Sequence, residues 1–264
     1  MRVLHGPRLR GIVARIVPTD DSSWLAVSPG SLHSVSAVIP AESCSLWLTE
    51  LDQWADSARD SKDCLDQLDW DRAARKPEGR VRERFISSRV VLRRILGALL
   101  RVQPAILRFR IDEHGKPTLV TPHQRCHFNL SHSDNVLLVG TSLSVRIGVD
   151  IEVPRSVPRA QQLSTRVFTT DERLLLSQAI EISEAARDEA FLRIWTRKEA
   201  YLKCRGDGFT TPARDYAVGL DGSMRLDDLE IRSLDLPSPG YAALASAAPI
   251  SHVRQYRLCR DDTI

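Results

Sequence analysis

Lysine is scarce in this chain of 264 residues. Five of its 37 basic residues are lysines and the other 32 are arginines, although lysine is normally among the commonest residues. The five are Lys62, Lys76, Lys116, Lys198 and Lys203. Lysine offers phosphate a compact point charge and can give up a proton, whereas arginine stays protonated. The few lysines therefore mark positions to examine for phosphate chemistry.

Cysteine pairs and long apolar runs are lacking too. The five cysteines are odd in number and widely spaced, without a C-x-x-C pair, which argues against a disulfide framework or a zinc site. No apolar run approaches the ~18 residues of a membrane span. The first residues lack the apolar core of a signal peptide. We therefore expect a cytoplasmic protein without a membrane segment.

Several common catalytic signatures are absent. The sequence has no Walker A loop and no G-x-G-x-x-G fingerprint. It also has no G-x-S-x-G elbow, which argues against a hydrolase built on the adjacent Ser131 and His132. A substrate carrying nucleotide phosphates must therefore be bound in another way.

The composition is that of an ordinary globular protein, with 42% hydrophobic and 27% charged residues. It excludes wholesale disorder, and the length suits one large domain or two of about 100–150 residues. Residues 1–41 show no persistent period, and we expect an N-terminal extension of uncertain order there. The rest divides into an N-terminal subdomain at 42–145 and a C-terminal subdomain at 146–264.

Each of these subdomains is predicted to hold a long helix and several strands. Apolar residues at helical spacing predict helices over 80–102 and 183–204, and a capping box at Thr169 predicts a shorter helix to about residue 181. Alternating residues predict strands in the first half and across the boundary between the halves, at 43–51, 106–111, 117–121, 127–130, 135–141 and 147–153. We expect the last two strands to pair through a turn at 142–146.

The basic residues concentrate around the first long helix. Between Arg72 and Arg110 we count twelve basic residues and two acidic ones, a local excess of +10. Such an excess attracts nucleic acid, a phosphorylated small molecule or an acidic protein. A solvated helix face is the alternative interpretation.

Two carboxylates, Asp150 and Glu152, share one face of the strand Gly148–Glu152, because side chains alternate along a strand. Carboxylates side by side repel each other unless a cation lies between them. Mg²⁺ suits such a pair, since it prefers one or two carboxylates together with substrate phosphates. Two unrelated acids on a solvent-facing strand remain an equal alternative.

On the second long helix, Thr196, Glu199 and Lys203 lie on one stripe. Glu199 has the chemistry of a third metal ligand, a general base, or both, and Lys203 that of a group that neutralises phosphate charge. A surface Glu–Lys pair worth ~0.3 kcal/mol is the alternative. Earlier in the sequence, Ser131 and His132 follow an apolar strand, in a loop suited to binding phosphate or in a plain turn.

Together these three clusters indicate metal-assisted chemistry on a phosphoanhydride.

Four motifs in order give the sequence a resemblance to a known family. They are G-K-P at 115–117, F-N-L-S-H-S at 128–133, G-V-D-I-E at 148–152 and F-L-R-I-W-T-R-K-E-A-Y-L-K at 191–203. This series resembles the signature of Sfp-type 4′-phosphopantetheinyl transferases of the W/KEA subgroup, and the basic helix is similar to the one that family has. The resemblance extends from about residue 43 to the end.

The resemblance implies an α/β fold with a pseudo-twofold axis, in which each of two similar subdomains packs a long helix on a small, mostly antiparallel sheet. It implies transfer of the phosphopantetheine arm of coenzyme A to a serine of an apo acyl or peptidyl carrier protein, with release of 3′,5′-ADP. Mg²⁺, or Mn²⁺, would be bound by Asp150, Glu152 and Glu199. Glu199 would also take the serine proton, and Lys203 would bind the pyrophosphate.

The same resemblance assigns the other coenzyme A contacts. Ser131 and His132 would contact a phosphate, and Lys116 would lie beside the adenine or the 3′-phosphate. Lys198 matches the motif as a substrate contact or as a support of the helix. For the 3′-phosphate the spacing leaves four candidate residues open: Arg75, Lys76, Arg80 and Arg84. Of these four we favour Arg84.

The expected partner is an acidic carrier domain, which the basic helix would attract. No nucleic-acid module accompanies the basic residues, so we expect no nucleic-acid partner, and a monomer is the simplest expectation. Two alternatives remain: a catalytically silent protein of this fold that binds coenzyme A or a carrier, and a protein that binds DNA through the basic helix.

Overall fold

The structure is a computed structural model that describes residues 24–32, 34, 43–56, 64–113, 115–120, 126–206 and 212–259. Its strands are β1 (Trp24–Val27), β2 (Ser43–Glu50), β3 (Phe109–Ile111), β4 (Pro117–Leu119), β5 (His127–Ser133), β6 (Val136–Ser142), β7 (Ile147–Glu152), β8 (Ser223–Leu226), β9 (Leu229–Leu234), β10 (Tyr241–Ser246) and β11 (His252–Leu258). Its α-helices are α3 (Gln67–Ala74), α4 (Arg80–Leu100), α5 (Ala160–Val167), α6 (Thr170–Ile182) and α7 (Glu184–Arg205).

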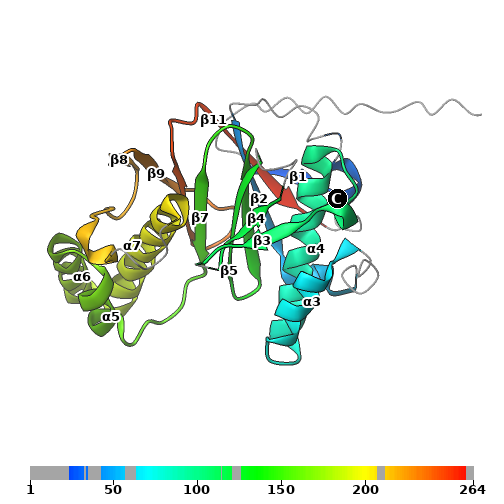
Figure 1. The fold of residues 1–264 in the computed structure, drawn as a ribbon. Helices are drawn as coiled ribbons and strands as arrows, with labels where there is room; N and C mark the ends of the chain where they lie inside the picture. Colours follow the sequence, from blue (N-terminus) through cyan, green and yellow to red (C-terminus); the bar gives the residue numbers. More distant parts are fainter. Residues whose placement is uncertain are drawn as a thin grey trace, which may run out of the picture.

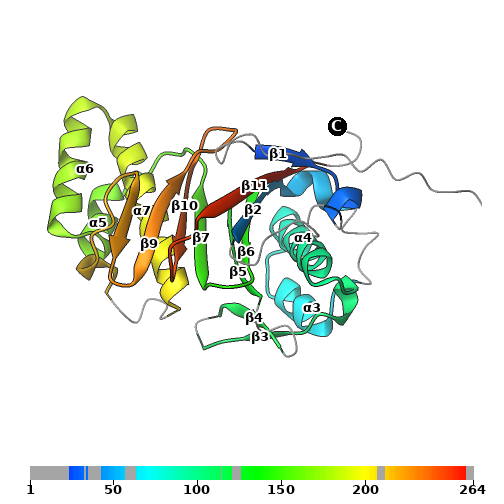
Figure 2. The ribbon, with the colours of Figure 1, turned by 90° about the horizontal axis from the view of Figure 1, so that it is seen from above.

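Two sheets form the centre of the molecule. One has the strand order β1-β11-β2-β6-β5 and the other β7-β10-β9-β8, while β3 and β4 form a separate ribbon. Helices α3 and α4 lie on one side of the strands and α5, α6 and α7 on the other (Figure 1), and the view from above shows the same order (Figure 2). The expected α/β fold, a long helix on each of two small sheets, is confirmed.

The buried side chains explain these layers. Trp47 of β2 packs with α4, while its neighbours Leu46 and Leu48 point to the other face and pack against Val149 and Ile151 of β7. The opposite face of the second sheet packs on α7. The period-two alternation of a strand thus builds one core on each side of each sheet.

The expectation that residues 135–141 and 147–153 pair as neighbouring strands is wrong. β6 pairs with β2 and β5 in the first sheet, whereas β7 pairs with β10 in the second. The turn between β6 and β7 therefore carries the chain from one sheet to the other. A turn-like sequence looks the same whether it joins two strands within one sheet or passes between two sheets.

Both ends of the described chain contribute to the first sheet. β11 lies in the sequence range of the C-terminal subdomain, yet it pairs in parallel with β2. β1, from the expected N-terminal extension, pairs in parallel with β11. No helix among the described residues is long and apolar enough to cross a membrane. All five cysteines are free thiols.

Candidate active site

Asp150 lies at the centre of the site, on the face of β7 that points toward α7. Its side chain is almost fully buried, with 4% of its surface exposed. Its Oδ1 accepts hydrogen bonds from Ser131 Oγ and from Lys203 Nζ, both at 2.6 Å. Its Oδ2 is also buried but has no hydrogen-bond partner in the part of the chain that the structure describes. Asp150 thus joins β5, β7 and α7 while one carboxylate oxygen stays uncommitted.

Gly148 permits this close approach of strand and helix. A Cβ atom at Gly148 would lie 2.2 Å from the carbonyl oxygen of Ala200 and 2.4 Å from the backbone nitrogen of Cys204. Both are backbone atoms of α7, which cannot rotate away, so only glycine fits here. The glycine of the G-V-D-I-E motif therefore brings β7 against the turn of α7 that carries Lys203.

Glu152 lies two residues farther along the same face of β7. Ser133 donates a hydrogen bond to its Oε2 at 2.7 Å, and Arg155 donates one to its Oε1 at 3.2 Å. Ser131 and Ser133 of β5 thus hold Asp150 and Glu152 of β7 in the same order. Ser133 was not among the predicted site residues, although the period of two that S-H-S at 131–133 shares with D-I-E at 150–152 was a signal for it.

Glu199 faces the same group of charges from α7. Its carboxylate makes no hydrogen bond to any residue that the structure describes. Burial raises the pKa of Glu199 to about 7; Asp150 and Glu152 act in the same direction, and Lys203 opposes them. Burial likewise raises the pKa of Asp150, against the influence of Lys203 and Ser131. With a pKa of about 7, the Glu199 carboxylate is suited to accept a proton near neutral pH.

The carboxylates of this site have oxygen atoms available as ligands for a hard divalent ion. Among the described residues no group of three metal-ligating side chains stands ready to enclose a metal. However, no described residue hydrogen-bonds the buried Oδ2 of Asp150. Mg²⁺ usually keeps several waters and takes one or two carboxylates together with phosphates. In this structure the ammonium of Lys203 supplies the positive charge beside Asp150.

A cavity of about 390 Å³ opens beside these carboxylates. The residues lining it that bear on phosphate binding are Arg72, Lys76, Lys116, His132, Glu199 and Lys203. Burial lowers the pKa of His132, and Lys203, Lys76 and Arg84 lower it further. Cations therefore predominate in the described lining, in which Glu199 is the acid, and this excess of positive charge suits a bound diphosphate.

The structure distinguishes the basic candidates before and at the start of α4. Lys76 lines the cavity together with Arg72, which the sequence analysis did not single out, and both cations lie 5.7 Å from the ring centre of Phe85. Arg84 is paired with Asp52 at 2.8 Å and with Asp134 at 2.7 Å. Arg75, Arg80 and Arg84 are not among the residues that line this cavity.

The two remaining motif lysines have structural contacts. Lys116 Nζ donates to the backbone carbonyl of Lys203 at 2.7 Å, which ties the turn before β4 to the end of α7. Lys198 is 3% exposed and pairs with Glu172 at 2.8 Å. It also donates to the carbonyls of Ala213 and Tyr216. Lys198 is absent from the lining of the cavity and supports the fold around α7.

Comparisons with known proteins agree with this arrangement. A family model described as the 4′-phosphopantetheinyl transferase superfamily matches residues 146–242. The chain is 33% identical over 188 residues to the 4′-phosphopantetheinyl transferase HetI of Nostoc sp. (strain PCC 7120), a match that covers 70% of this chain and 76% of HetI. The chain belongs to the 4′-phosphopantetheinyl transferase family.

Two further members of the family match at similar levels. The 4′-phosphopantetheinyl transferase Sfp of Bacillus subtilis (strain 168) is 28% identical over 167 residues, which are 60% of this chain and 71% of Sfp. The 4′-phosphopantetheinyl transferase AcpT of Escherichia coli (strain K12) is 35% identical over 130 residues, 49% of this chain and 61% of AcpT. The residues matched by the transferase family model include Asp150, Glu152, Glu199 and Lys203.

Proposed function

We propose that this protein transfers the phosphopantetheine arm of coenzyme A to a serine of an apo carrier protein and releases 3′,5′-ADP. One observation carries the proposal: Lys203 and Asp150 pair across the cleft, and Glu199 lies beside them without a hydrogen bond to any described residue. That arrangement supplies a cation for a diphosphate and a base for a hydroxyl group in one place.

In this reaction the serine oxygen attacks the phosphorus that carries the pantetheine arm, and the bond from that phosphorus to the bridging oxygen of the ADP portion breaks. Glu199, directly or through a water, takes the proton that the serine loses, because serine is a weak nucleophile at neutral pH and needs a positioned base. Lys203 stabilises the negative charge that develops on the departing 3′,5′-ADP. A positive charge already in place at that point costs no reorganisation during the reaction.

Asp150, Glu152 and Glu199 are the residues that would hold Mg²⁺ or Mn²⁺. When bound there, such an ion would neutralise diphosphate charge. Ser131 and Ser133 fix the orientation of Asp150 and Glu152. Lys76, Arg72 and His132 line the cavity where the phosphates of the adenosine portion would lie.

The partner we propose is an acidic carrier domain, which the excess of +10 between Arg72 and Arg110 would attract. One chain contributes both β5 and α7 to the cleft. We therefore propose that the monomer is the active form.

The test is a mass-shift assay. Purified protein, coenzyme A and Mg²⁺ are incubated with several apo carrier proteins, and we expect each accepted carrier to gain the mass of one phosphopantetheine arm. Glu199→Gln should bind coenzyme A but lose most of the transfer, while Glu189→Gln, on an exposed part of the same helix, should be unchanged. Tight binding of coenzyme A without any mass gain across the panel would indicate a catalytically silent binding protein instead.

A further inference from the structure

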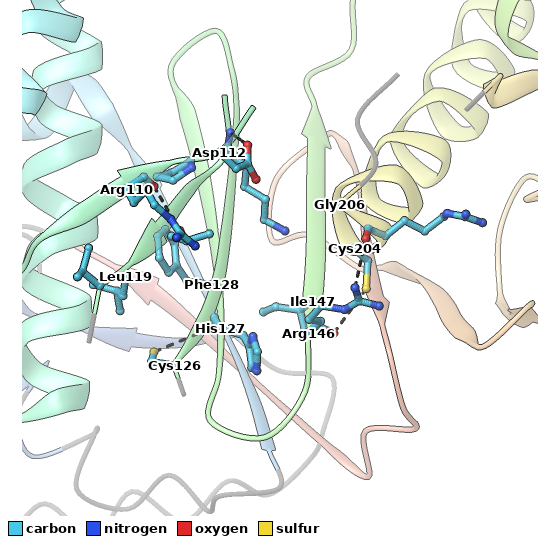
Figure 3. Close-up of a pocket in the computed structure, with 15 residues that line it drawn as sticks. Arg110, Asp112, Leu119, Cys126, His127, Phe128, Arg146, Ile147, Cys204 and Gly206 are labelled. Carbon is cyan, nitrogen blue, oxygen red and sulfur yellow. Dashed lines mark hydrogen bonds between the residues drawn. The ribbon is translucent and has the colours of Figure 1, made fainter. Parts of the chain in front are cut away.

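A second cavity, of about 490 Å³, adjoins the catalytic cleft at Lys116. It is formed by the β3–β4 ribbon, the first residues of β5 and β7, and the end of α7. Figure 3 shows Arg110 and Asp112 on one side of it, Arg146 and Cys204 on the other, and His127 and Phe128 between them. Its volume lies in the range of small-molecule sites, roughly 300–1,000 Å³.

The charges around this cavity are unbalanced. Arg110, Lys116 and Arg146 contribute three positive charges, while Asp112 is the acidic residue in the described lining. Asp112 is already engaged, because its Oδ1 accepts a hydrogen bond from the backbone nitrogen of Lys116 at 2.8 Å. Arg205 also lines the cavity but pairs with Asp227 at 3.3 Å. The cavity therefore presents a net positive field.

Arg110 and Arg146 have no carboxylate partner among the residues that the structure describes. The Arg146 guanidinium donates a hydrogen bond to the carbonyl of Arg205 at 3.3 Å. Between the two arginines, burial lowers the pKa of His127, and Lys116 and Arg146 lower it further. Guanidinium groups with free donors recognise phosphate well, because the planar fork can donate two parallel hydrogen bonds.

The walls of the cavity are apolar. Phe128 and Leu119 are buried, and Ile147 and Pro117 complete the surface between the charged groups. An inorganic ion would leave these walls in contact with water. A ligand with an apolar body would cover them, at a gain of about 25 cal/mol per Å² of apolar surface removed from water.

The cavity adjoins the catalytic cleft, and the two share Lys116, Pro117 and Gly206 in their linings. Lys116 lines both cavities, and its ammonium is held by the carbonyl of Lys203 at 2.7 Å. Arg110, His127 and Arg146 line the second cavity alone, while Lys76, His132 and Glu199 line the first alone. The two cavities therefore have different cation sets that can be removed independently.

We propose that this cavity is a second ligand site, distinct from the catalytic cleft, which takes a phosphate monoester carried on an aromatic or aliphatic body. Arg110 and Arg146 bind the phosphate from opposite sides, and Phe128 and Leu119 contact the apolar body. The proposal goes beyond phosphopantetheine transfer, since none of these four residues takes part in that reaction.

The test measures binding of phenyl phosphate to the full chain by isothermal titration calorimetry, without coenzyme A or metal. We expect saturable binding that is stronger than that of inorganic phosphate or of phenol. Arg146→Ala, and separately Arg110→Ala, should weaken it about tenfold, the loss of one charge-assisted hydrogen bond. Arg166→Ala, an exposed arginine on α5, is the matched control and should bind as the wild type does.

Lys76→Ala locates the site. It removes a cation from the catalytic cleft and should leave phenyl phosphate binding unchanged. Binding lost in Lys76→Ala but kept in Arg146→Ala would place the ligand in the catalytic cleft and overturn the proposal, as would an absence of binding to the wild type. Circular dichroism of each variant shows whether it is folded, and none of these measurements depends on transfer activity.

Discussion

Lys198 and Lys203 stand on the same helix, one turn and a half apart, in opposite kinds of surroundings. Lys198 is buried, paired with Glu172, and donates to two backbone carbonyls, so its hydrogen-bonding capacity is filled. Lys203 lies at the cleft, and its ammonium contacts Asp150 and Ser131. A filled network holds a structure in place, whereas a group at an open cleft can exchange its partner for a ligand.

The carboxylates opposite these lysines show the same contrast. Both oxygens of Glu172 are used: Oε2 accepts from Lys198 and from the backbone of Thr169, and Oε1 accepts from the backbone of Val218. Among the described residues, nothing hydrogen-bonds one buried oxygen of Asp150, and nothing hydrogen-bonds Glu199. Unsatisfied buried polar atoms are rare and call for an explanation. Here the explanation is the ligands that the cleft is built to receive.

Lys198→Met should produce the largest effect on stability. Removing one partner of a buried ion pair leaves the charge of Glu172 uncompensated, which costs about 3–5 kcal/mol. Chemical denaturation with urea measures the loss in the free energy of unfolding. At low temperature, the molecules that remain folded should transfer the arm at close to the wild-type rate, because Lys198 does not line the catalytic cavity.

The double variant Glu172→Gln/Lys198→Met is the control for this prediction. It removes both charges, so it should recover part of the stability that the single variant loses. A Lys198→Met protein with wild-type stability but no activity would contradict the contrast, because Lys198 would then act in the reaction and not in the stability of the fold.

Lys203→Met should show the reverse pattern. Loss of a positioned charge that acts in the transition state lowers kcat by about 10²–10³, as seen for comparable electrostatic donors. Steady-state transfer to an apo carrier measures it, with a circular dichroism spectrum to show that the fold is kept. If kcat falls less than tenfold, Lys203 is not the group that stabilises the leaving 3′,5′-ADP.

How far the sequence predicts the site depends on how local each part is. The strand at 147–153 and the helix at 183–204 each carry their charged residues at fixed spacing, so the shared faces of Asp150 with Glu152 and of Glu199 with Lys203 follow from periodicity alone. The role of Gly148 needed the structure, because its neighbour is a helix fifty residues later in the chain. From the sequence, Lys198 and Lys203 could be placed on different faces of the helix. Helical spacing does not show that Lys198 lies in the core and Lys203 at the cleft.

The basic residues before and at the start of α4 show which positions the sequence alone does not assign. Arg84 was the favoured contact for the 3′-phosphate, and the structure instead places it in ion pairs with Asp52 and Asp134, both remote in sequence. Arg72 and Lys76 line the cavity because α3 folds back onto α4. Spacing along the chain carries no information about that packing.

Glu199→Gln should make the metal-free protein more stable at alkaline pH. The folded-state pKa of Glu199 is raised to about 7, so the folded state disfavours the charged form. Below the unfolded pKa, about 4.3, both states are protonated and the two proteins should be equally stable. The penalty in the wild type grows between these values and is complete above pH 7, where the variant should gain roughly 3–4 kcal/mol.

Urea denaturation at pH 4 and pH 8, in the presence of a chelator, measures this difference. Glu189→Gln, an exposed glutamate on the same helix, is the control and should show no such pH dependence. A variant less stable than the wild type at pH 8 would mean that the Glu199 carboxylate is held by favourable contacts, and would remove the contrast with Glu172.

Phe85→Leu should give the smallest effect, and it concerns a third lysine, Lys76. No carboxylate partner holds the Lys76 ammonium among the described residues; the Phe85 ring lies 5.7 Å from it and from the Arg72 guanidinium. Losing cation–π contacts of about 0.5–1 kcal/mol each leaves both cations less ordered, so the KM for coenzyme A should rise about fivefold with kcat unchanged. Phe85→Tyr keeps the ring and should restore the KM. The rise should be smaller for dephospho-coenzyme A, which lacks the 3′-phosphate; an equal rise for both substrates would mean that Phe85 contacts another part of the molecule.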